Sequence, residues 1–490
     1  MSEEGPDLVV AGAGGGLAGA LRAAQLGLDV LVVEVSEHYR RGNNTSMSTA
    51  MIPGAGSRFQ RAAGIEDSPE LFFGDIMRKT KGEADPRLAR ALTRVSARLV
   101  EWLADDMELP LSVVTDFHYP GHSADRCHTI EGRHGTLLLD HLVGRVKREG
   151  RIDLLVPARL VDVRLDDGGR VRAAVVETPD GATEEIPTRA VLLATNGYGA
   201  DRELVGRYLP EIADAVYHGS EASRGDALRI GARLGAATAY LDAYQGHGAL
   251  AARSSTLVGW ATVMHGAVIV GKDGRRFGNE TTGYSEYAAV IARQPGSTGW
   301  IVLDKRIHDA CLAFTDFRQT IEGGALVWAD DVAGIAAATG LPADALAEEL
   351  ATTAALARGE GEDRFGRTFF EAELAPPFAV VQVVPALFHT QGGLVVDEHA
   401  RVTREDGSAI EGLYASGGAA EGISGHGAAG YLAGNGLLPA LGLAYLAADH
   451  LAADHLAADH LAADHLAADH LADSSPLSST RELTSEEGSA

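Results

Sequence analysis

The sequence is short of cysteine, of positive charge and of long apolar runs. Its two cysteines, Cys127 and Cys311, cannot build a disulfide framework in a chain of 490 residues. A formal net charge of −26 at pH 7 leaves no basic face for nucleic acid or for an anionic membrane surface. Charges and glycine turns interrupt every apolar run before it reaches the roughly 18 residues of a membrane span. We therefore expect no nucleic-acid partner and no membrane span.

The first residues also lack the features of an export signal. The start MSEEGPDLVV has no basic segment and passes directly into an apolar run, so no signal peptide is expected. With 46% apolar and 22% charged residues, the composition is that of a globular protein. These features favour a cytoplasmic enzyme, and 490 residues are enough for two or three domains.

Residues 7–34 (DLVVAGAGGGLAGALRAAQLGLDVLVVE) have the pattern of a nucleotide-binding unit. An apolar strand runs into a glycine-rich turn, an Ala/Leu helix follows, and a second apolar strand ends at Glu34. Glycines let the backbone approach a pyrophosphate at the helix N-terminus, and the Glu34 carboxylate can accept hydrogen bonds from a ribose. Residues 188–199 (TRAVLLATNGYG) repeat the strand and turn but not the helix and the acid-tipped strand. One bound cofactor is therefore expected.

The expected secondary structure changes twice along the middle of the chain. Two strands are expected around the DDGG turn within residues 160–175, and a helix over residues 225–236. Residues 240–386 mix apolar runs with helical stretches at 331–357 and are interpreted as an inserted domain. A strand signal returns at GGLVVDEHARV, before a glycine-rich loop and an Ala/Leu helix.

The C-terminal segment repeats AADHL from about Ala447 to Leu471. Its histidines recur every five residues, so at about 100° per residue they do not share one helix face. A two-histidine metal site on a helix prefers a spacing of four, which here joins His450 to Asp454 instead, and no metal site is predicted. The repeat is interpreted as an extension of a terminal helix, with metal binding or a partner helix as alternatives. Residues 473–490 are typical of a disordered tail.

Six motifs follow one another along the chain. They are the N-terminal nucleotide turn, LLATNGYGADREL, GDALRIGARLGA, GAVIVGKDGRRFGNE, FHTQGGLVVD and EGLYASGG. In this order they resemble the fumarate reductase/succinate dehydrogenase flavoprotein superfamily (FAD-binding type 2), which includes fumarate reductases, urocanate reductase and 3-ketosteroid dehydrogenases. The resemblance implies bound FAD and an α/β fold, in which an inserted α+β capping domain closes over a Rossmann-like FAD-binding domain.

The resemblance assigns the domains and the cofactor contacts. The FAD-binding domain is expected at 1–240 and 387–446, the capping domain at 241–386, and the helical extension with its tail at 447–490. The FAD contacts implied at matching positions are Gly12, Gly14, Gly15, Gly16, Glu34, Asn44, Thr45, Ser48, Ala158, Ala194, Thr195, Gly197, Gly417, Gly418, Asn435, Gly436 and Leu437. Two positions depart from the family pattern: Asn196 replaces a usual glycine, and Gly418 stands where many members have glutamate.

The active-site motifs differ from those of the fumarate reductases. Those enzymes bind a dicarboxylate with arginines and histidines and protonate it with an arginine, because burying two carboxylates without cations is costly. Two histidines match, His247 in YQGHG and His389 in FHTQGG. The arginines do not match: Tyr284 stands at the proton-donor place, HGAAGY ends in Tyr431, and WATVMHG contains no arginine. Fumarate reduction is therefore disfavoured.

The loop EGISGHGAAGYLAGNGLL resembles the GI…GYxSGxxL element of the 3-ketosteroid Δ4-dehydrogenases, with Ala433 in place of the serine. In those enzymes this tyrosine works with a second tyrosine just past the R-F-x-N-E element. Tyr431 and Tyr284 fall at or within one residue of the two places. The hypothesis is that Tyr284 transfers the proton from the carbon next to a carbonyl, while Tyr431 donates to the carbonyl oxygen.

Other residues are expected to support these two tyrosines. His247 and His389 would orient the substrate or the tyrosines, and a backbone N–H near Gly434 could complete an oxyanion hole. Tyr119 in YPGHS is a candidate lid residue near the pocket. Glu280 is interpreted as a structural partner of the backbone or of Arg276.

The function expected is FAD-dependent α,β-dehydrogenation of a neutral ketone, cyclic or steroid-like, with hydride transfer to FAD N5. The partners expected are a small-molecule carbonyl substrate and an external electron acceptor, which would be a quinone, oxygen or a redox protein. One alternative is the reverse reaction of an enone or enoate reductase. Another is a flavin-binding partner subunit without turnover, docked through the AADHL tail.

Overall fold

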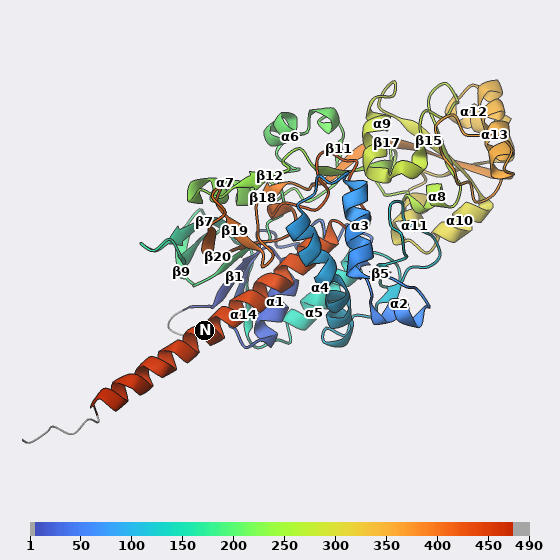
Figure 1. Cartoon of the computed structure of the whole chain (residues 1–490). Coiled ribbons are helices and arrows are strands. Elements are labelled where there is room, and N and C mark those ends of the chain that lie inside the picture. The colour runs from blue at the N-terminus through green and yellow to red at the C-terminus, as the bar shows by residue number, and fades with distance from the viewer. Residues whose placement is uncertain (1–4, 474–490) are drawn as a thin grey trace, which may run out of the picture.

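A computed structural model describes residues 5–473 of the chain (Figure 1). Its central element is a six-stranded sheet in the order β19-β20-β10-β1-β2-β6, in which β19 is antiparallel to β20 and the other neighbours are parallel. The strands are β1 (Leu8–Ala11), β2 (Val30–Val33), β6 (Ile152–Leu155), β10 (Val191–Leu193), β19 (Arg401–Thr403) and β20 (Ala409–Ala415). β1, β2 and β10 are buried along their whole length, which explains their unbroken apolar sequences.

The helices of this lobe are α1 (Gly16–Gln25), α3 (Pro69–Lys79), α4 (Pro86–Asp105), α5 (Gly135–Val146) and α14 (Leu437–Asp473). α1 and α14 contact strands of the sheet, α5 packs on α1, and α3 packs on α4. α14 lies along α1 and also contacts α4 (Figure 1). The approach of α14 to α1 is close because α1 has a glycine at the crossing: a Cβ on Gly19 would lie 2.9 Å from the carbonyl oxygen of Ala444.

Short elements complete the first lobe. They are the antiparallel sheet of β7 (Arg159–Leu165), β8 (Val171–Glu177) and β9 (Thr183–Pro187), the sheet of β3 (Ile52–Pro53), β4 (Ser112–Val113) and β5 (Cys127–Thr129), the pair β12 (Thr238–Ala239) and β18 (Gly393–Leu394), the helices α2 (Arg58–Ala62), α6 (Arg202–Tyr208) and α7 (Asp226–Leu234), and the 3₁₀ turns η1 (Pro210–Ile212) and η3 (Gly417–Ala419). The expected strand pair around DDGG is confirmed as β7 and β8, and the expected helix over 225–236 as α7.

A second lobe is built on the long strand β17 (Phe378–Thr390), at the upper right of Figure 1. β17 pairs with four strands, and a further strand, β14, pairs with β15. These strands are β11 (Val216–Tyr217), β13 (Tyr244–Ala251), β14 (Val268–Val270), β15 (Gly299–Asp304) and β16 (Val327–Ala329). The helices and turn are α8 (Ala261–Met264), η2 (Glu280–Thr282), α9 (Tyr284–Ala292), α10 (Lys305–Cys311), α11 (Thr315–Glu322), α12 (Val332–Thr339) and α13 (Ala343–Ala357). α12 and α13 confirm the helical stretches expected at 331–357.

The expected α/β class is confirmed, with most of the second lobe inserted between β10 and β20 of the parallel sheet. The domain boundaries stay a proposal, because β11 lies before residue 241 and β17 runs across residue 386. α14 continues through the AADHL repeat to Asp473, while the tail expected to be disordered lies, from residue 474, outside the described residues.

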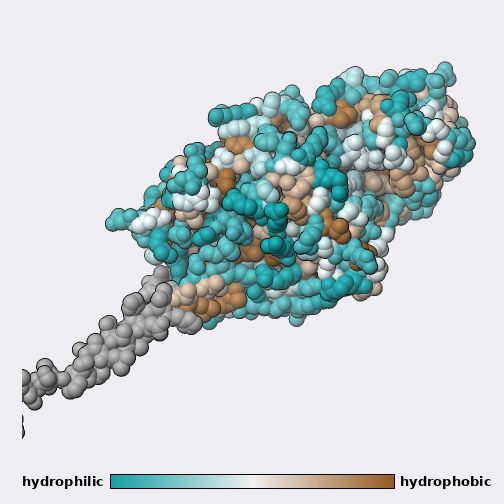
Figure 2. Space-filling view, viewed as in Figure 1, coloured by the Kyte–Doolittle hydropathy of each residue, from teal (hydrophilic) through white to brown (hydrophobic). Residues whose placement is uncertain are grey.

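The described residues give two further findings. No helix within 5–473 is long and apolar enough to cross a membrane. On the face that Figure 2 shows, the surface of the body is mostly hydrophilic, with hydrophobic residues scattered over it. Near the AADHL repeat, His450 pairs with Asp454 at 3.5 Å and lies 3.0 Å from the hydroxyl of Tyr414. The start of the repeat is thus in contact with β20.

The glycine at the α1–α14 crossing gives a test of this packing. Gly19→Ala would place a methyl group against Leu192 and Ala444, and we expect a loss of about 1–3 kcal/mol in the free energy of unfolding. The matched control is Gly74→Ala in α3, where nothing lies within 4 Å and a gain of up to about 1 kcal/mol is expected. Chemical unfolding followed by tryptophan fluorescence measures both; equal effects would contradict the close crossing.

Candidate active site

A deep cavity lies between the two lobes and holds most of the residues singled out by the sequence. Its empty volume is ≈ 1810 Å³ including the open mouth. One end is formed where β1, β2 and β10 terminate, which is where parallel α/β sheets bind ligands. The other end is formed by β13, β17 and the loops that lead into α9 and α14.

The glycine turn after β1 forms the floor of the first end. Gly12 has φ +113°, and a Cβ there would collide with the carbonyl oxygen of Ala194. Gly15 precedes the first turn of α1, and a Cβ on it would lie 2.7 Å from the Cβ of Ala440. The turn can therefore carry a phosphate against bare backbone at a helix N-terminus.

Glu34 follows β2 at the edge of the same floor. Its carboxylate accepts hydrogen bonds from the N–H groups of Ala13 (2.7 Å) and Ser36 (2.9 Å). Burial raises the pKa of Glu34 above its ordinary value, although these backbone bonds oppose the rise. The glutamate is thus fixed beside the glycine turn, at the place expected for a ribose acceptor.

Most of the cofactor positions expected from the sequence line this cavity. They are Gly12, Gly14, Gly15, Glu34, Asn44, Thr45, Ser48, Ala158, Ala194, Thr195, Gly417, Gly418, Gly436 and Leu437. Three lie behind the lining: Gly16 packs at the start of α1, Gly197 faces the hydroxyl of Thr390, and Asn435 is fully buried and donates to Ser424. These three shape the cavity from outside.

Two buried hydroxyls in the lining fit a bound cofactor. The Oγ atoms of Thr195 and Ser416 have no hydrogen-bond partner within the described residues. Buried polar groups nearly always have partners, so both hydroxyls are suited to a ligand rich in acceptors. The glycine turn, the fixed glutamate and these hydroxyls together fit FAD.

Two asparagines at the cavity wall have clear structural roles. Asn44 donates to the carbonyl of Phe388 (2.8 Å) and accepts from the N–H of Ser220 (2.9 Å), so it ties the cofactor loop to the second lobe. Asn196 has φ +63° and donates to Ser223 Oγ (2.9 Å). Asparagine tolerates this left-handed conformation better than most residues, so Asn196 fits the turn without a glycine.

The second end of the cavity is built around two tyrosines. Tyr284 is the first residue of α9 and Tyr431 lies in the loop before α14; their rings meet edge to face with centroids 5.7 Å apart. Burial raises the pKa of both phenols. The nearby Tyr284 hydroxyl and Gly436 N–H oppose this rise in the pKa of Tyr431, so Tyr431 is the better proton donor of the pair.

The histidines expected at the site lie beside these tyrosines and are uncharged. His247 stacks on Tyr284 (centroids 4.8 Å apart) and on Phe388 (5.2 Å). Burial lowers the pKa of His247 to about 3 and that of His389 to about 4. The N–H of Ala249 donates to Nδ1 of His247, so the single proton is on Nε2, and this histidine is a neutral donor.

Permanent positive charge is scarce in the lining. Among the described residues that line the cavity, Arg159 is the one arginine and no lysine occurs. Arg159 adjoins Ala158 and therefore lies at the nucleotide end. The tyrosine end offers neutral phenols and imidazoles, which match a neutral carbonyl group better than a dianion.

Tyr119 and Gly434, the two other residues expected at the substrate, also line the cavity. Tyr119 packs edge to face on Phe117, with centroids 4.7 Å apart, and its burial raises its pKa. Gly434 has φ +91°, and a Cβ there would collide with Pro53. The cavity thus brings together all six residues expected to act on or bind substrate.

Sequence reasoning missed several large side chains of the lining. They are Phe117, His218, Trp260, Phe314, Asp316 and Phe388. Trp260 is held by a bond from its Nε1 to the carbonyl of Glu280 (3.1 Å), and Glu280 pairs with Arg276 at 2.7 Å, which confirms its expected structural role. In the motif WATVMHG the sequence shows a missing arginine, and the structure adds Trp260 as a residue that lines the cavity.

Comparison with known proteins identifies the family. The profile of the FAD binding domain family matches residues 7–437, and the chain belongs to this family. The chain is therefore an FAD-dependent oxidoreductase. Membership of this family favours an enzyme over a flavin-binding partner subunit without turnover. NADH:fumarate oxidoreductase of Klebsiella pneumoniae (strain 342) is 29% identical over 426 residues, covering 86% of this chain. The match takes up 45% of that relative, so the chain spans less than half of its length.

Solved structures show the same fold. The open conformation of a flavocytochrome c3 fumarate reductase is 28% identical, with a TM-score of 0.76 over 92% of this chain and 78% of that chain. 3-Ketosteroid-Δ4-(5α)-dehydrogenase from Rhodococcus jostii RHA1, in complex with 4-androstene-3,17-dione, is 22% identical, with a TM-score of 0.71 over 92% of this chain and 98% of that chain. At 22% identity, the similarity to the Rhodococcus enzyme shows a shared fold.

The glycine turn predicts how FAD binding is lost. Gly12→Ala would strain the backbone at φ +113° and collide with Ala194, and we expect protein purified without yellow flavin. Gly27→Ala is the matched control, because Gly27 has φ +94° but nothing within 4 Å, so strain occurs without the collision. The ratio of flavin to protein absorbance measures the outcome, with circular dichroism to verify folding. Full flavin content in folded Gly12→Ala would refute this placement.

Proposed function

We propose that the enzyme forms a C=C bond next to the carbonyl group of a neutral ketone, cyclic or steroid-like. The observation that carries this proposal is the pair Tyr284 and Tyr431, whose rings lie in edge-to-face contact at a cavity end without arginine or lysine among its described lining residues. A dicarboxylate buried there would lack paired cations. A ketone needs none, since hydrogen-bond donors suffice to stabilise its enolate or enol.

The two phenols form a path for a proton. The proton leaves the α carbon for the oxygen of Tyr284, the proton of that hydroxyl passes to the oxygen of Tyr431, and the proton of Tyr431 passes to the carbonyl oxygen. One C–H bond breaks and one O–H bond forms, so the ketone becomes its enol. Both tyrosines remain neutral, as their burial and raised pKa values require.

The remaining groups hold the substrate in place. His247 presents its Nε2–H as a neutral donor, and its ring keeps Tyr284 in position by stacking. His389 packs edge to face on Tyr431, with centroids 6.1 Å apart. Gly434 lines the same cavity wall as Tyr431 and Ala433, and its N–H is the backbone donor proposed for the carbonyl oxygen. Bound FAD would supply the acceptor for the hydride of the β carbon. The proton on the carbonyl oxygen would leave by the same path in reverse, to Tyr431 as Tyr431 passes its own proton to Tyr284, which releases one proton to water.

The bulky aromatic wall supports a cyclic substrate. Phe117, Trp260, Phe314 and Phe388 surround the tyrosine end and offer flat apolar faces. The Rhodococcus dehydrogenase of the same fold holds 4-androstene-3,17-dione, a flat polycyclic ketone. Reoxidation of the flavin then requires an external acceptor, for which a quinone, oxygen or a redox protein is proposed.

One observation favours a second candidate, an FAD-dependent enone or enoate reductase. Two similar proteins above 25% identity, the Klebsiella oxidoreductase and the flavocytochrome c3, are named for fumarate. The same proton path run backwards would protonate the α carbon of an enone. The lining without cations favours a neutral enone over fumarate in that case as well.

The tyrosine pair gives the central test. Tyr284→Phe and Tyr431→Phe should each keep bound FAD but slow its anaerobic bleaching by a reactive ketone by on the order of 10²–10³-fold. Tyr287→Phe is the matched control on the same helix, because the Tyr287 hydroxyl is buried without a partner within the described residues. Stopped-flow absorbance of the flavin measures all three. Wild-type rates in both active-site variants would refute the mechanism.

Substrate charge separates ketones from dicarboxylates. We expect steroid or cyclic ketones to bleach the flavin anaerobically, and fumarate to leave photoreduced flavin unchanged because no arginine pairs its carboxylates. A panel of 4-androstene-3,17-dione, cyclohexanone, cyclohexenone and fumarate covers the alternatives. Reoxidation by cyclohexenone alone would favour the reductase, and rapid reoxidation by fumarate would overturn the neutral-substrate proposal.

A further inference from the structure

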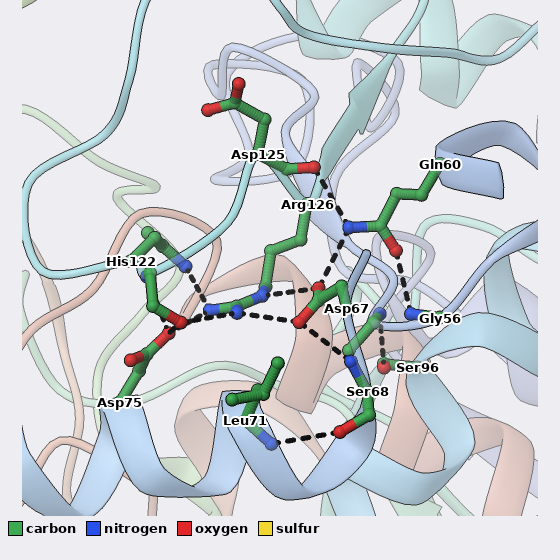
Figure 3. Close-up of polar contacts among 12 residues, drawn as sticks. Gly56, Gln60, Asp67, Ser68, Leu71, Asp75, Ser96, His122, Asp125 and Arg126 are labelled. Carbon is green, nitrogen blue, oxygen red and sulfur yellow. Dashed lines mark hydrogen bonds and ion pairs between the residues drawn. The ribbon is translucent and has the colours of Figure 1, made fainter. Parts of the chain in front are cut away.

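A buried arginine lies behind the tyrosine loop and outside the cavity lining. Arg126 directly precedes β5, and its side chain is 0% exposed. Its Nε and Nη2 donate to the two oxygens of Asp67, each at 2.9 Å, and its Nη1 donates to Asp75 at 2.5 Å (Figure 3). The two carboxylates compensate the buried cation and fix the plane of the guanidinium.

The same guanidinium determines which nitrogen of a neighbouring histidine carries the proton. Nη1 of Arg126 lies 3.0 Å from Nδ1 of His122 (Figure 3). A guanidinium only donates, so Nδ1 must accept and the single proton of the neutral ring is on Nε2. Burial, and then the charge of Arg126, lower the pKa of His122 to about 3, so the ring is neutral.

The Nε2–H of His122 in turn donates to the carbonyl oxygen of Ala433 at 3.1 Å. The peptide between Ala433 and Gly434 is trans, so its N–H points opposite to its carbonyl, away from His122. Ala433 and Gly434 both line the cavity, and the Gly434 N–H has no acceptor within the described residues. A backbone donor without a partner is thus presented on the cavity side of the loop.

We propose that His122 and Arg126 are positioning residues that orient the Ala433–Gly434 peptide, so that the Gly434 N–H and the Tyr431 hydroxyl together hold the substrate's carbonyl oxygen. The proposal rests on the proposed function, in which that oxygen accepts the developing negative charge. The new element is that His122 and Arg126 set the direction of the Gly434 N–H, the second donor of the oxyanion hole.

The chain of bonds also strengthens this donor. Donation from the charged Arg126 makes Nε2–H of His122 a stronger donor, and its bond to the Ala433 carbonyl polarises the peptide towards a more acidic N–H. The segment is anchored on its other side as well, since the N–H and the hydroxyl of Ser123 both donate to Asp75, at 2.7 and 2.8 Å. The ion pairs of Arg126 are therefore linked to the Ala433–Gly434 peptide of the cavity wall through the imidazole of His122.

Two amide variants separate the two bonds of His122. In His122→Gln the amide nitrogen takes the place of Nε2 and keeps the bond to Ala433. In His122→Asn the shorter amide takes the place of Nδ1 and reaches Arg126 only. We expect His122→Asn to lower the maximal rate of flavin bleaching by about tenfold to hundredfold with KM within about twofold, and His122→Gln to recover most of the rate.

A ligand that ionises tests the oxyanion site without turnover. 4-Nitrophenol titrates near neutral pH and changes its absorbance on losing its proton, so its ionisation state can be read when bound. We expect the wild-type holoenzyme and His122→Gln to bind it as the phenolate, and His122→Asn to bind the phenolate at least about tenfold more weakly. Flavin content and the unfolding midpoint of each variant verify that the fold is kept.

Including Tyr431→Phe distinguishes the two ways to fail. If Tyr431→Phe weakens phenolate binding and His122→Asn does not, the relay is wrong and the proposed function stands. If wild-type protein takes up only the neutral phenol, or if Tyr431→Phe binds phenolate as tightly as wild type, the oxyanion site itself is wrong, and both proposals fall. Equal loss in His122→Gln and His122→Asn would also overturn the relay, because His122→Gln keeps the bond to Ala433 and His122→Asn does not.

Discussion

The close packing of α14 on α1 is the contact on which the active site depends. Gly15 and Gly19 let α14 approach the nucleotide turn, with Ala440 and Ala444 directly opposite. α14 begins at Leu437, so this packing also sets where the preceding loop with Tyr431 lies relative to the cofactor floor. A cofactor turn near the start of the chain and a substrate loop near its end are thereby held at one cavity. Substituting larger residues at the crossing would displace both.

The protein uses its buried cations as supports and leaves the reaction space neutral. Arg126 is paired with two aspartates behind the Tyr431 loop, and Arg276 is paired with Glu280 behind the loop that carries Tyr284. A buried charge with good partners fixes its surroundings, while an unpaired one would be costly. The arginines missing from the cavity thus have counterparts outside it, where they determine the direction of peptides and the place of Trp260 through Glu280. Neutral phenols and imidazoles then meet the substrate.

Much of the fold and of the candidate site could be predicted from the sequence, because short motifs of neighbouring residues indicate them. The glycine turn with Glu34 and the apolar strands predicted a nucleotide-binding unit, and the family resemblance of six motifs implied FAD. Two loop motifs that resemble the 3-ketosteroid dehydrogenases predicted that Tyr284 and Tyr431 would lie together. The parts that could not be predicted depend on contacts between distant segments. His122 reads as a polar residue in a loop until Arg126 and Ala433 are placed on either side of it. Gly16, Gly197 and Asn435 match family positions yet lie behind the cavity lining, since a motif gives the order of residues and not the side they face.

The proton path runs between the two lobes. Tyr284 belongs to the second lobe and Tyr431 to the first, so the path depends on the state in which the two lobes are in contact. Lys79 of α3 supports this state from outside the cavity: its Nζ donates to the carbonyl of Thr282 at 2.8 Å and to Glu286 at 3.0 Å, on either side of Tyr284. Both lobes thus enclose the path from the α carbon to the carbonyl oxygen, and a substrate held there reacts away from bulk water.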